Sequence, residues 1–120
     1  MSEKVALVTG CNKGIGFATL KKLSLTGVKI FACVRKIDEK FLSSLNKLKN
    51  KNLIPVEFDL DNKDQVKSAI AEIKSKTKSI DMLVNNAATI DTALFQMTTE
   101  SKLKKIFETN FFSQLYFTQQ

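Results

Sequence analysis

A glycine-rich segment, TGCNKGIG at residues 9–16, has the residue types that bind phosphate. It contains three of the four glycines in the chain, Gly10, Gly14 and Gly16, and it joins an apolar run to a helical pattern. Gly10 permits a sharp turn out of a strand, Gly14 lets a ligand approach the backbone, and Gly16 lets a helix pack closely. Because the N–H groups of a first helical turn attract anions, we predict a phosphate-binding loop here. A tight turn without a ligand is the alternative.

Apolar runs and helical patterns alternate along the 120 residues, without a linker or repeat. This order predicts one α/β domain over residues 1–120. Strands are expected at Val5–Thr9, Lys29–Val34 and Leu53–Phe58 and within Ile80–Ala87, and helices from Gly14 until Gly27, after N-caps at Asp38 and Asp61, and from Thr98 or Thr99 to the C-terminus.

The positions of these elements predict a three-layer, doubly wound parallel sheet of the Rossmann type. Strands that alternate with helices pair in parallel through right-handed crossovers. The four strands would supply the first half of such a sheet, in the order 3-2-1-4. Pro55 supports this order because it lacks the N–H that a central strand needs, so it places the third strand at the edge.

Apolar spacing predicts which surfaces are covered. The run MLV at residues 82–84 is typical of a strand buried on both faces, although the order 3-2-1-4 leaves one edge of that strand unpaired. The last helix is apolar on most sides, so a chain without partners would expose a large apolar patch. We therefore expect a homo-oligomer formed through this helix, or marginal stability. The expected buried positions are Phe41, Leu42, Leu45 and Leu48, then Val66, Ala69, Ile70 and Ile73, and the apolar positions of the last helix are Phe107, Phe111, Leu115, Phe112 and Tyr116.

Four segments, in order and over the whole chain, resemble the short-chain dehydrogenase/reductase family. TGCNKGIG is similar to that family's cofactor loop, T-G-x-x-x-G-x-G. FDLDN at residues 58–62 is similar to its D-[LV] after the third strand, LVNNAA at 83–88 to its N-N-A-G, and ETNFFS at 108–113 to the T-N of its next helix. The interval between the last two segments resembles that of the 3-oxoacyl-carrier-protein reductases.

The resemblance implies contacts with a dinucleotide. Asn12 and the backbone of Ile15 are expected to contact the pyrophosphate. Asp59 is expected to bind the adenine amino group, with the backbone of Leu60 beside it. Together with the glycines, these residues would hold the adenosine and pyrophosphate parts of the cofactor.

The resemblance also implies roles for the last two segments. Asn86 and Ala87 are expected to line the adenosine ribose. Ala88 stands where the family has Gly, and its methyl group either crowds the nicotinamide ribose or is harmless. Asn110 matches the Asn of the family's Asn-Ser-Tyr-Lys catalytic set, where it kinks a helix and positions a water in the proton relay. A buried Asn bonded to backbone is a second interpretation, compatible with the first.

Two cations indicate which nicotinamide cofactor is preferred. Proteins that bind NAD place an acid at the end of the second strand, on the ribose 2′-hydroxyl. Here that position is Val34, followed by Arg35, the only arginine in the chain, and Lys13 precedes Gly14. A guanidinium and an ammonium together suit a 2′-phosphate, so we predict NADP(H) in preference to NAD(H). The alternative for Arg35 is a surface position in a polar loop.

The expected function is that of an NADP(H)-dependent oxidoreductase acting on a small-molecule carbonyl or alcohol substrate. In the family, the catalytic Ser and the Tyr-x-x-x-Lys lie beyond the position of Gln120, and Tyr116 is followed four residues later by Gln120 rather than Lys. We therefore expect the 120 residues to represent the cofactor-binding part, truncated before those residues and inactive alone. The alternative is an inactive nucleotide-binding or chain-associating Rossmann fragment.

Charge and composition bear on three other possibilities: nucleic-acid binding, metal binding and the location of the protein in the cell. The net charge of +7 suggests a nucleic-acid binder, but the lysines are spread over outward helical positions, which favours solvated faces. The chain has no His, and Cys11 and Cys33 lack metal-ligand spacing, so no metal site is expected. Free thiols, together with an N-terminus that shows neither a signal peptide nor a membrane segment, predict a cytoplasmic protein that does not contact membranes.

Overall fold

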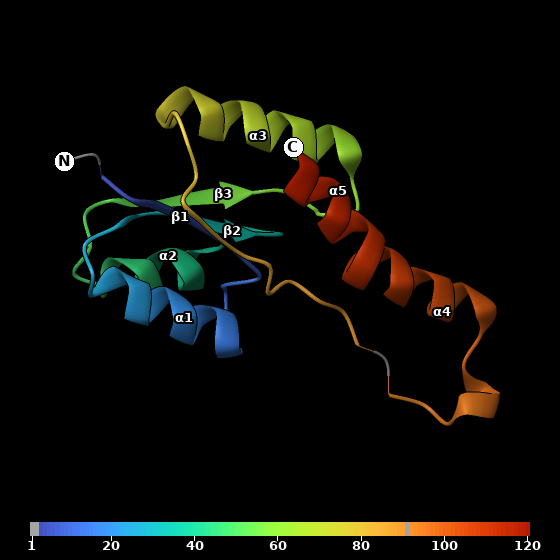
Figure 1. Ribbon diagram of the computed structural model, residues 1–120. Helices are drawn as coiled ribbons and strands as arrows, with labels where there is room; N and C mark the ends of the chain where they lie inside the picture. Colours follow the sequence, from blue (N-terminus) through green and yellow to red (C-terminus); the bar gives the residue numbers. More distant parts are fainter. Residues whose placement is uncertain (1–2, 91) are drawn as a thin grey trace.

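Four parallel strands form the sheet of this computed structural model, which describes residues 3–90 and 92–120 (Figure 1). The order β3-β2-β1-β4 confirms the predicted topology. Pro55 lies on the edge strand β3, opposite Ala32 of β2, as expected. Met1, Ser2 and Asp91 of the predicted domain lie outside the described residues. The strands are β1 (Val5–Thr9), β2 (Lys29–Val34), β3 (Leu53–Glu57) and β4 (Met82–Val84).

Helices cover both faces of the sheet, which gives the three layers that were predicted. On one side lie α1 (Gly14–Ser24) and α2 (Glu39–Asn46), and on the other lie α3 (Lys63–Lys76) and α5 (Ser113–Gln119) (Figure 1). Side chains of β1 alternate between the two cores, with Val5 and Leu7 towards α3 and Ala6 and Val8 towards α1. Burial on both faces explains why β1 and β2 are almost wholly apolar.

The predicted buried face of α2 is correct at two positions and wrong at one. Phe41 and Leu45 are buried, whereas Leu42 is 41% exposed. Adjacent residues of a helix differ by about 100°, so Leu42 turns away from the sheet that Phe41 contacts. Leu48 lies beyond the end of α2 and is half-buried. The helix begins as predicted, because Asp38 accepts a hydrogen bond from the Phe41 N–H at 2.7 Å.

The predicted cap of α3 is off by one residue. Asn62, not Asp61, is the N-cap, and its Oδ1 accepts the N–H of Gln65 at 3.1 Å. The Asp61 carboxylate instead turns towards the C-terminal part of the chain. Three residues of the apolar face of α3 are buried as expected, and Ile70 is half-buried; the buried ones are Val66, Ala69 and Ile73.

One helical segment, which we call the terminal helix, runs from Glu100 to Gln119. It consists of α4 (Glu100–Phe107), a π-helical turn (Glu108–Phe112) and α5, and a short 3-10 turn (Phe95–Met97) precedes it. Thr99 is its N-cap, since its hydroxyl accepts the N–H of Lys102 at 3.2 Å. Phe107, Phe111 and Leu115 are each at least half exposed, so the expected apolar patch is present.

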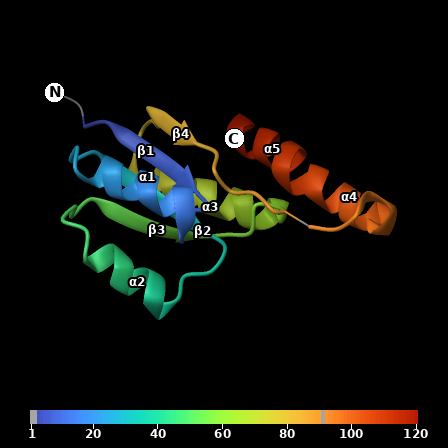
Figure 2. The same ribbon diagram turned by 90° about the horizontal axis from the view of Figure 1, so that it is seen from below.

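The expectation that β4 is buried on both sides is wrong in this chain. Leu83 is 36% exposed, and Met82 and Val84 are only half-buried. Figure 2 shows β4 beside β1 at the edge of the sheet, and within residues 3–90 and 92–120 it pairs only with β1. A strand at an edge lacks the cover that a central strand has, although the sequence MLV suits a central one.

Candidate functional site

The glycine segment turns sharply at the carboxyl end of β1. Gly10 has φ +62° and Gly14 has φ +60°, a region of backbone conformation that favours glycine. A Cβ on Gly10 would lie 2.8 Å from the Cα of Ala87, so the loop also packs tightly against the segment after β4. A Cβ on Gly14 would meet nothing within 4 Å, so this side of the loop is open. The loop therefore has one packed side and one side accessible to a ligand.

Gly16 allows the close packing that its position in the loop predicted. A Cβ there would lie 2.2 Å from the Gly10 carbonyl oxygen and 2.5 Å from Nδ2 of Asn86. The neighbours are thus the loop itself and the segment after β4, rather than the body of a strand. Any side chain at position 16 would push α1 away from the end of β1.

The start of α1 differs from the starts of α2, α3 and α4. Those three have a capping side chain and an acidic residue in the first turn. In α1 the N-cap residue is Lys13, whose side chain makes no capping hydrogen bond, and the first turn contains no acid. The Ile15 side chain beside it is 79% exposed, and Asn12 is exposed too. First-turn N–H groups without a side-chain acceptor, together with a nearby cation, favour an anion.

Thr9, at the end of β1, joins the glycine loop to the segment after β4. Its Oγ1 accepts the N–H groups of Asn86 and Ala87 at 3.1 and 3.0 Å. The side-chain amide of Asn86 in turn donates to the carbonyl of Gly10 at 3.0 Å. Ala87 is half-buried and Ala88 is exposed. The structure thus brings together two predicted segments that lie 76 residues apart.

The turn after β3 holds the carboxylate of Asp59. Its Oδ1 accepts the N–H of Asp61 at 3.0 Å, and the Asp59 N–H donates to Oε1 of Gln65 at 2.8 Å. Asp59 is half-buried, while the Leu60 side chain belongs to the core under α3. The bond to the Asp61 N–H orients the Asp59 side chain, and the bond to Gln65 fixes its backbone.

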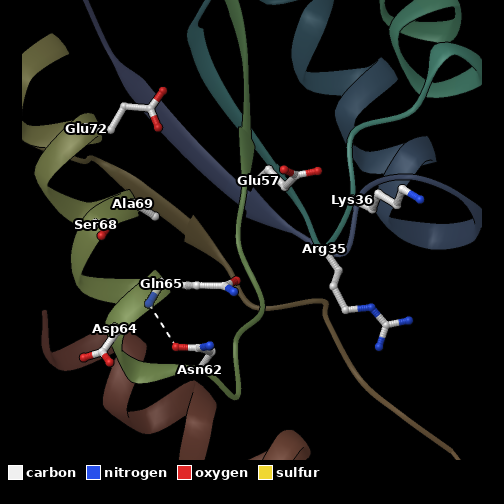
Figure 3. Close-up of a pocket in the computed structure, with 9 residues that line it drawn as sticks. All are labelled: Arg35, Lys36, Glu57, Asn62, Asp64, Gln65, Ser68, Ala69 and Glu72. Carbon is white, nitrogen blue, oxygen red and sulfur yellow. Dashed lines mark hydrogen bonds between the residues drawn. The ribbon is translucent and has the colours of Figure 1, made fainter.

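Arg35 follows β2 directly and is exposed. It lines a hollow of about 720 Å3 between the end of β2, the edge of β3 and α3, together with Glu57, Gln65 and Glu72. In Figure 3 the Arg35 and Lys36 side chains both extend away from α3, in different directions. The carboxylate of Glu57, on the neighbouring strand β3, is bonded to the loop after β2, since its Oε1 accepts the Ile37 N–H at 2.7 Å. Strand β2 itself ends at Val34, which is followed by Arg35, so its last position carries no acid.

Asn110 lies in the π-helical turn of the terminal helix, where the Ser113 N–H bonds to the Glu108 carbonyl, five residues back. Its Oδ1 accepts the Thr89 N–H and its Nδ2 donates to the Thr89 carbonyl, both at 2.8 Å. This π-helical turn lies where the family resemblance predicted a kink, and such turns often mark functional sites. The expected alternative of an Asn bonded to backbone is confirmed, and the two interpretations remain compatible.

Comparison with known proteins identifies the family. The model of the family described as short chain dehydrogenase matches residues 4–120. The chain belongs to the short-chain dehydrogenase family. The short-chain dehydrogenase anuI of Penicillium roqueforti is 30% identical over 115 residues, which are 93% of this chain and 46% of that protein.

Two solved structures share the fold of this short-chain dehydrogenase chain. The NADPH-bound carbonyl reductase from chicken fatty liver superposes with a TM-score of 0.89 at 25% identity, over 99% of this chain and 47% of that one. The 3-oxoacyl-[acyl-carrier protein] reductase from Brucella melitensis in complex with NAD gives a TM-score of 0.82 at 26% identity, over 99% and 47%. The chain therefore spans about half the length of the relatives it matches. Within the described residues, no helix has the length and apolarity needed to span a membrane.

One polar cluster of this short-chain dehydrogenase chain was not predicted from the sequence. The carboxylate of Asp61 accepts hydrogen bonds from the Lys105 ammonium and the Thr109 and Ser113 hydroxyls, at 2.7, 2.6 and 2.7 Å. Burial alone would raise the pKa of Asp61, but these three donors outweigh it and hold the pKa below its ordinary value. The sequence did contain a signal for this cluster, since Lys105, Thr109 and Ser113 are polar residues spaced by four along a helix that is apolar on most sides.

The two thiols lie on opposite faces of the sheet, in separate cores. Both are free and buried, as expected. Burial raises the pKa of Cys11 to about 12, and it also raises the pKa of Cys33 well above its ordinary value. Although Cys11 lies in the glycine loop, its buried, protonated thiol therefore packs in the core and does not act as a nucleophile.

Proposed function

We propose that the chain forms the dinucleotide-binding part of an oxidoreductase that transfers hydride between NADP(H) and a small-molecule carbonyl or alcohol. The observation that carries the proposal is the glycine loop between β1 and α1, which is open at Gly14 and leads into a helix start without an acid or a side-chain cap. Family membership and the NADPH-bound carbonyl reductase of the same fold support it. A direct test is titration of the 120-residue chain with NADPH, followed by the fluorescence of the reduced nicotinamide.

The residues present fit a dinucleotide. Asn12 and Ile15 are both exposed residues beside the open side of the loop, where a pyrophosphate would sit. Asp59 is half-buried and oriented by the turn after β3, as an acceptor for the adenine amino group would be. Asn86, Ala87 and the neighbouring Ala88 would line the ribose side. The bound cofactor would supply the hydride acceptor or donor.

We infer that Asn110, which matches the catalytic Asn of the family, is a positioning residue that acts through the shape of its helix. Its Oδ1 and Nδ2 both bond to the Thr89 backbone, so it holds the segment after β4 against the π-helical turn. A π-helical turn leaves backbone carbonyls without their usual i+4 donors, and such a carbonyl can hold a water for proton transfer. Asn110→Ala in an active protein that contains this sequence is expected to lower kcat more than it raises KM, and a pure KM effect would contradict this role.

We also propose a preference for NADP(H) over NAD(H). Arg35 and Lys13 are exposed at the carboxyl edge of the sheet and no acid ends β2, which suits a 2′-phosphate. Relatives of this fold are found with either cofactor, NADPH in one and NAD in another. Arg35→Asp is expected to lower the ratio of NADPH to NADH affinity by at least tenfold, since a charge-assisted bond is lost and a repulsion added. Lys47→Asp, an exposed lysine at the C-terminal end of α2, is the control, and an unchanged ratio for Arg35→Asp would refute the assignment.

A second candidate is a chain-associating protein without turnover, and the exposed apolar face of the terminal helix favours it. Phe107 is 62% exposed, Phe111 52% and Leu115 50%, all on one side. We propose that this face forms a homo-oligomer contact and that the protein is cytoplasmic, which two unbridged thiols support. Phe111→Glu is expected to reduce the mass observed in sedimentation equilibrium, and Lys102→Glu, an exposed position on the opposite side of the terminal helix, is the control. A monomeric unaltered chain would contradict the contact.

A further inference from the structure

The segment that follows β4 lies along one face of the terminal helix. Three side chains of the helix, four residues apart, bond to every second residue of residues 85–89. The pairs are Asn110 with Thr89, Gln114 with Ala87, and Thr118 with Asn85. Gln114 Nε2 donates to the Ala87 carbonyl, and Asn85 Nδ2 donates to the Thr118 hydroxyl at 3.1 Å. The two outer pairs therefore flank Gln114 on either side.

Three pairs form in succession because the rise of four helix residues is close to the length of two extended residues. Four residues of an α-helix rise about 6 Å. Two residues of extended chain cover about 6.6 Å. Because these distances are nearly equal, every fourth helix residue meets every second residue of an antiparallel extended segment. The face of the terminal helix thus sets the register of residues 85–89.

This register decides what the intervening residues face. Asn86 bonds on the side away from the terminal helix, since its N–H donates to the hydroxyl oxygen of Thr9 at 3.1 Å. Asn86 is also bonded to the glycine loop, through the carbonyl of Gly10 at 3.0 Å. Ala87 is held from both sides, since its N–H donates to Thr9 and its carbonyl accepts from Gln114. The helix therefore orients the wall of the proposed cofactor site without facing that site itself.

We propose that Gln114 is a positioning residue for cofactor binding, which fixes the Ala87 carbonyl and thereby directs Asn86 towards the glycine loop. The inference rests on the proposed function and adds a residue to it. Gln114 is half-buried, and its amide supplies the donor for a carbonyl beside the core. A carbonyl without that donor would be free to rotate its peptide, and the neighbouring residues with it.

The test uses the 120-residue chain and NADPH. Gln114→Met keeps the length of the side chain and removes the donor, and we expect the dissociation constant for NADPH to rise about tenfold. Gln114→Lys keeps a donor of similar reach and is expected to stay within about threefold of the unaltered chain. Gln119→Met is the matched control, an exposed glutamine of the same helix, and is expected to leave the affinity unchanged.

Two further measurements separate positioning from simple stabilisation. Affinities are determined at a temperature where urea unfolding shows each variant to be fully folded, so that lost stability alone cannot change them. A double-mutant cycle pairs Gln114→Met with Asn86→Ala, and the two losses are expected to be less than additive because both act through one segment. If Gln114→Met does not fold, Thr118→Val removes the neighbouring pair and is expected to weaken binding about threefold.

The outcomes are distinguishable. If the unaltered chain binds NADPH and Gln114→Met binds it equally well, this inference is overturned and the proposed function stands. Additive losses in the cycle, or equal losses in Gln114→Met and Gln119→Met, also overturn the inference alone. If the unaltered chain does not bind NADPH, the proposed function fails and the inference fails with it.

Discussion

Removal of the Asp61 carboxylate tests how the terminal helix is held to the rest of the chain. Asp61 belongs to the turn between β3 and α3, and its three donors are Lys105, Thr109 and Ser113 of the terminal helix. Asp61→Ala would leave two hydroxyls without their acceptor, one of them on the buried Ser113. The turn after β3 and the π-helical turn would then lose their polar connection.

The expected loss can be worked out from the exposure of each partner. A hydrogen bond from a hydroxyl to a carboxylate contributes about 1.5 kcal/mol, and there are two. The Lys105 side chain is 62% exposed, so its ion pair adds only about 0.5 kcal/mol. Because Asp61 is itself only 15% exposed, its desolvation cost offsets part of this gain. We expect Asp61→Ala to lower the free energy of unfolding by about 2–3 kcal/mol, which is large against the usual 5–15 kcal/mol.

Urea unfolding followed by circular dichroism at pH 7 measures this loss. Asp64→Ala is the matched control, since it removes an exposed carboxylate in the first turn of α3 and costs at most about 1 kcal/mol. Ser113→Ala combined with Asp61→Ala should cost less than the two single losses together, because they share one bond. Equal losses for Asp61→Ala and Asp64→Ala would refute the reasoning.

The same carboxylate gives the prediction a pH dependence. The pKa of Asp61 is lowered in the folded chain, so its contribution to stability is fully present above the unfolded value of about 3.9. That contribution is lost as the pH falls through the folded pKa. The difference in stability between the unaltered chain and Asp61→Ala should therefore shrink on acidification from pH 7 to below pH 4. A difference that stays constant over this range would contradict the assignment.

Three further predictions concern the glycine loop and its neighbours. Gly16→Ala should lower the free energy of unfolding by about 3 kcal/mol and weaken NADPH binding, because its Cβ would lie 2.2 Å from the Gly10 carbonyl oxygen; an unchanged melting temperature would contradict this. Thr9→Val should cost about 2 kcal/mol in urea unfolding, since two N–H groups lose their acceptor, and a cost below about 0.5 kcal/mol would count against it. Cys11 and Cys33 should not react with a thiol-specific disulfide reagent at pH 8 until urea is added, and a fast reaction of the native chain would disprove their burial.

Local patterns were sufficient to predict most of the sheet. The apolar runs at Val5–Thr9 and Lys29–Val34 are strands, Pro55 is on an edge strand, and the order is 3-2-1-4. The prediction of the α3 cap failed because two adjacent residues can both cap a helix, and the predictions for Leu42 and β4 failed because spacing does not say how fully a face is covered. Asp61 and Asn62 can both cap a helix, and spacing alone does not say which side chain another element will engage.

The sequence by itself determined the glycine loop and the family, because each matching segment is a short local pattern and the four segments follow one another in a fixed order. Only the tertiary structure decided that Asp61 holds the terminal helix and that Gln114 holds Ala87. Those contacts join residues 27 to 52 positions apart. Their partners are set by how α5 packs on the sheet, and nothing in the local pattern around Gln114 specifies which carbonyl it will meet.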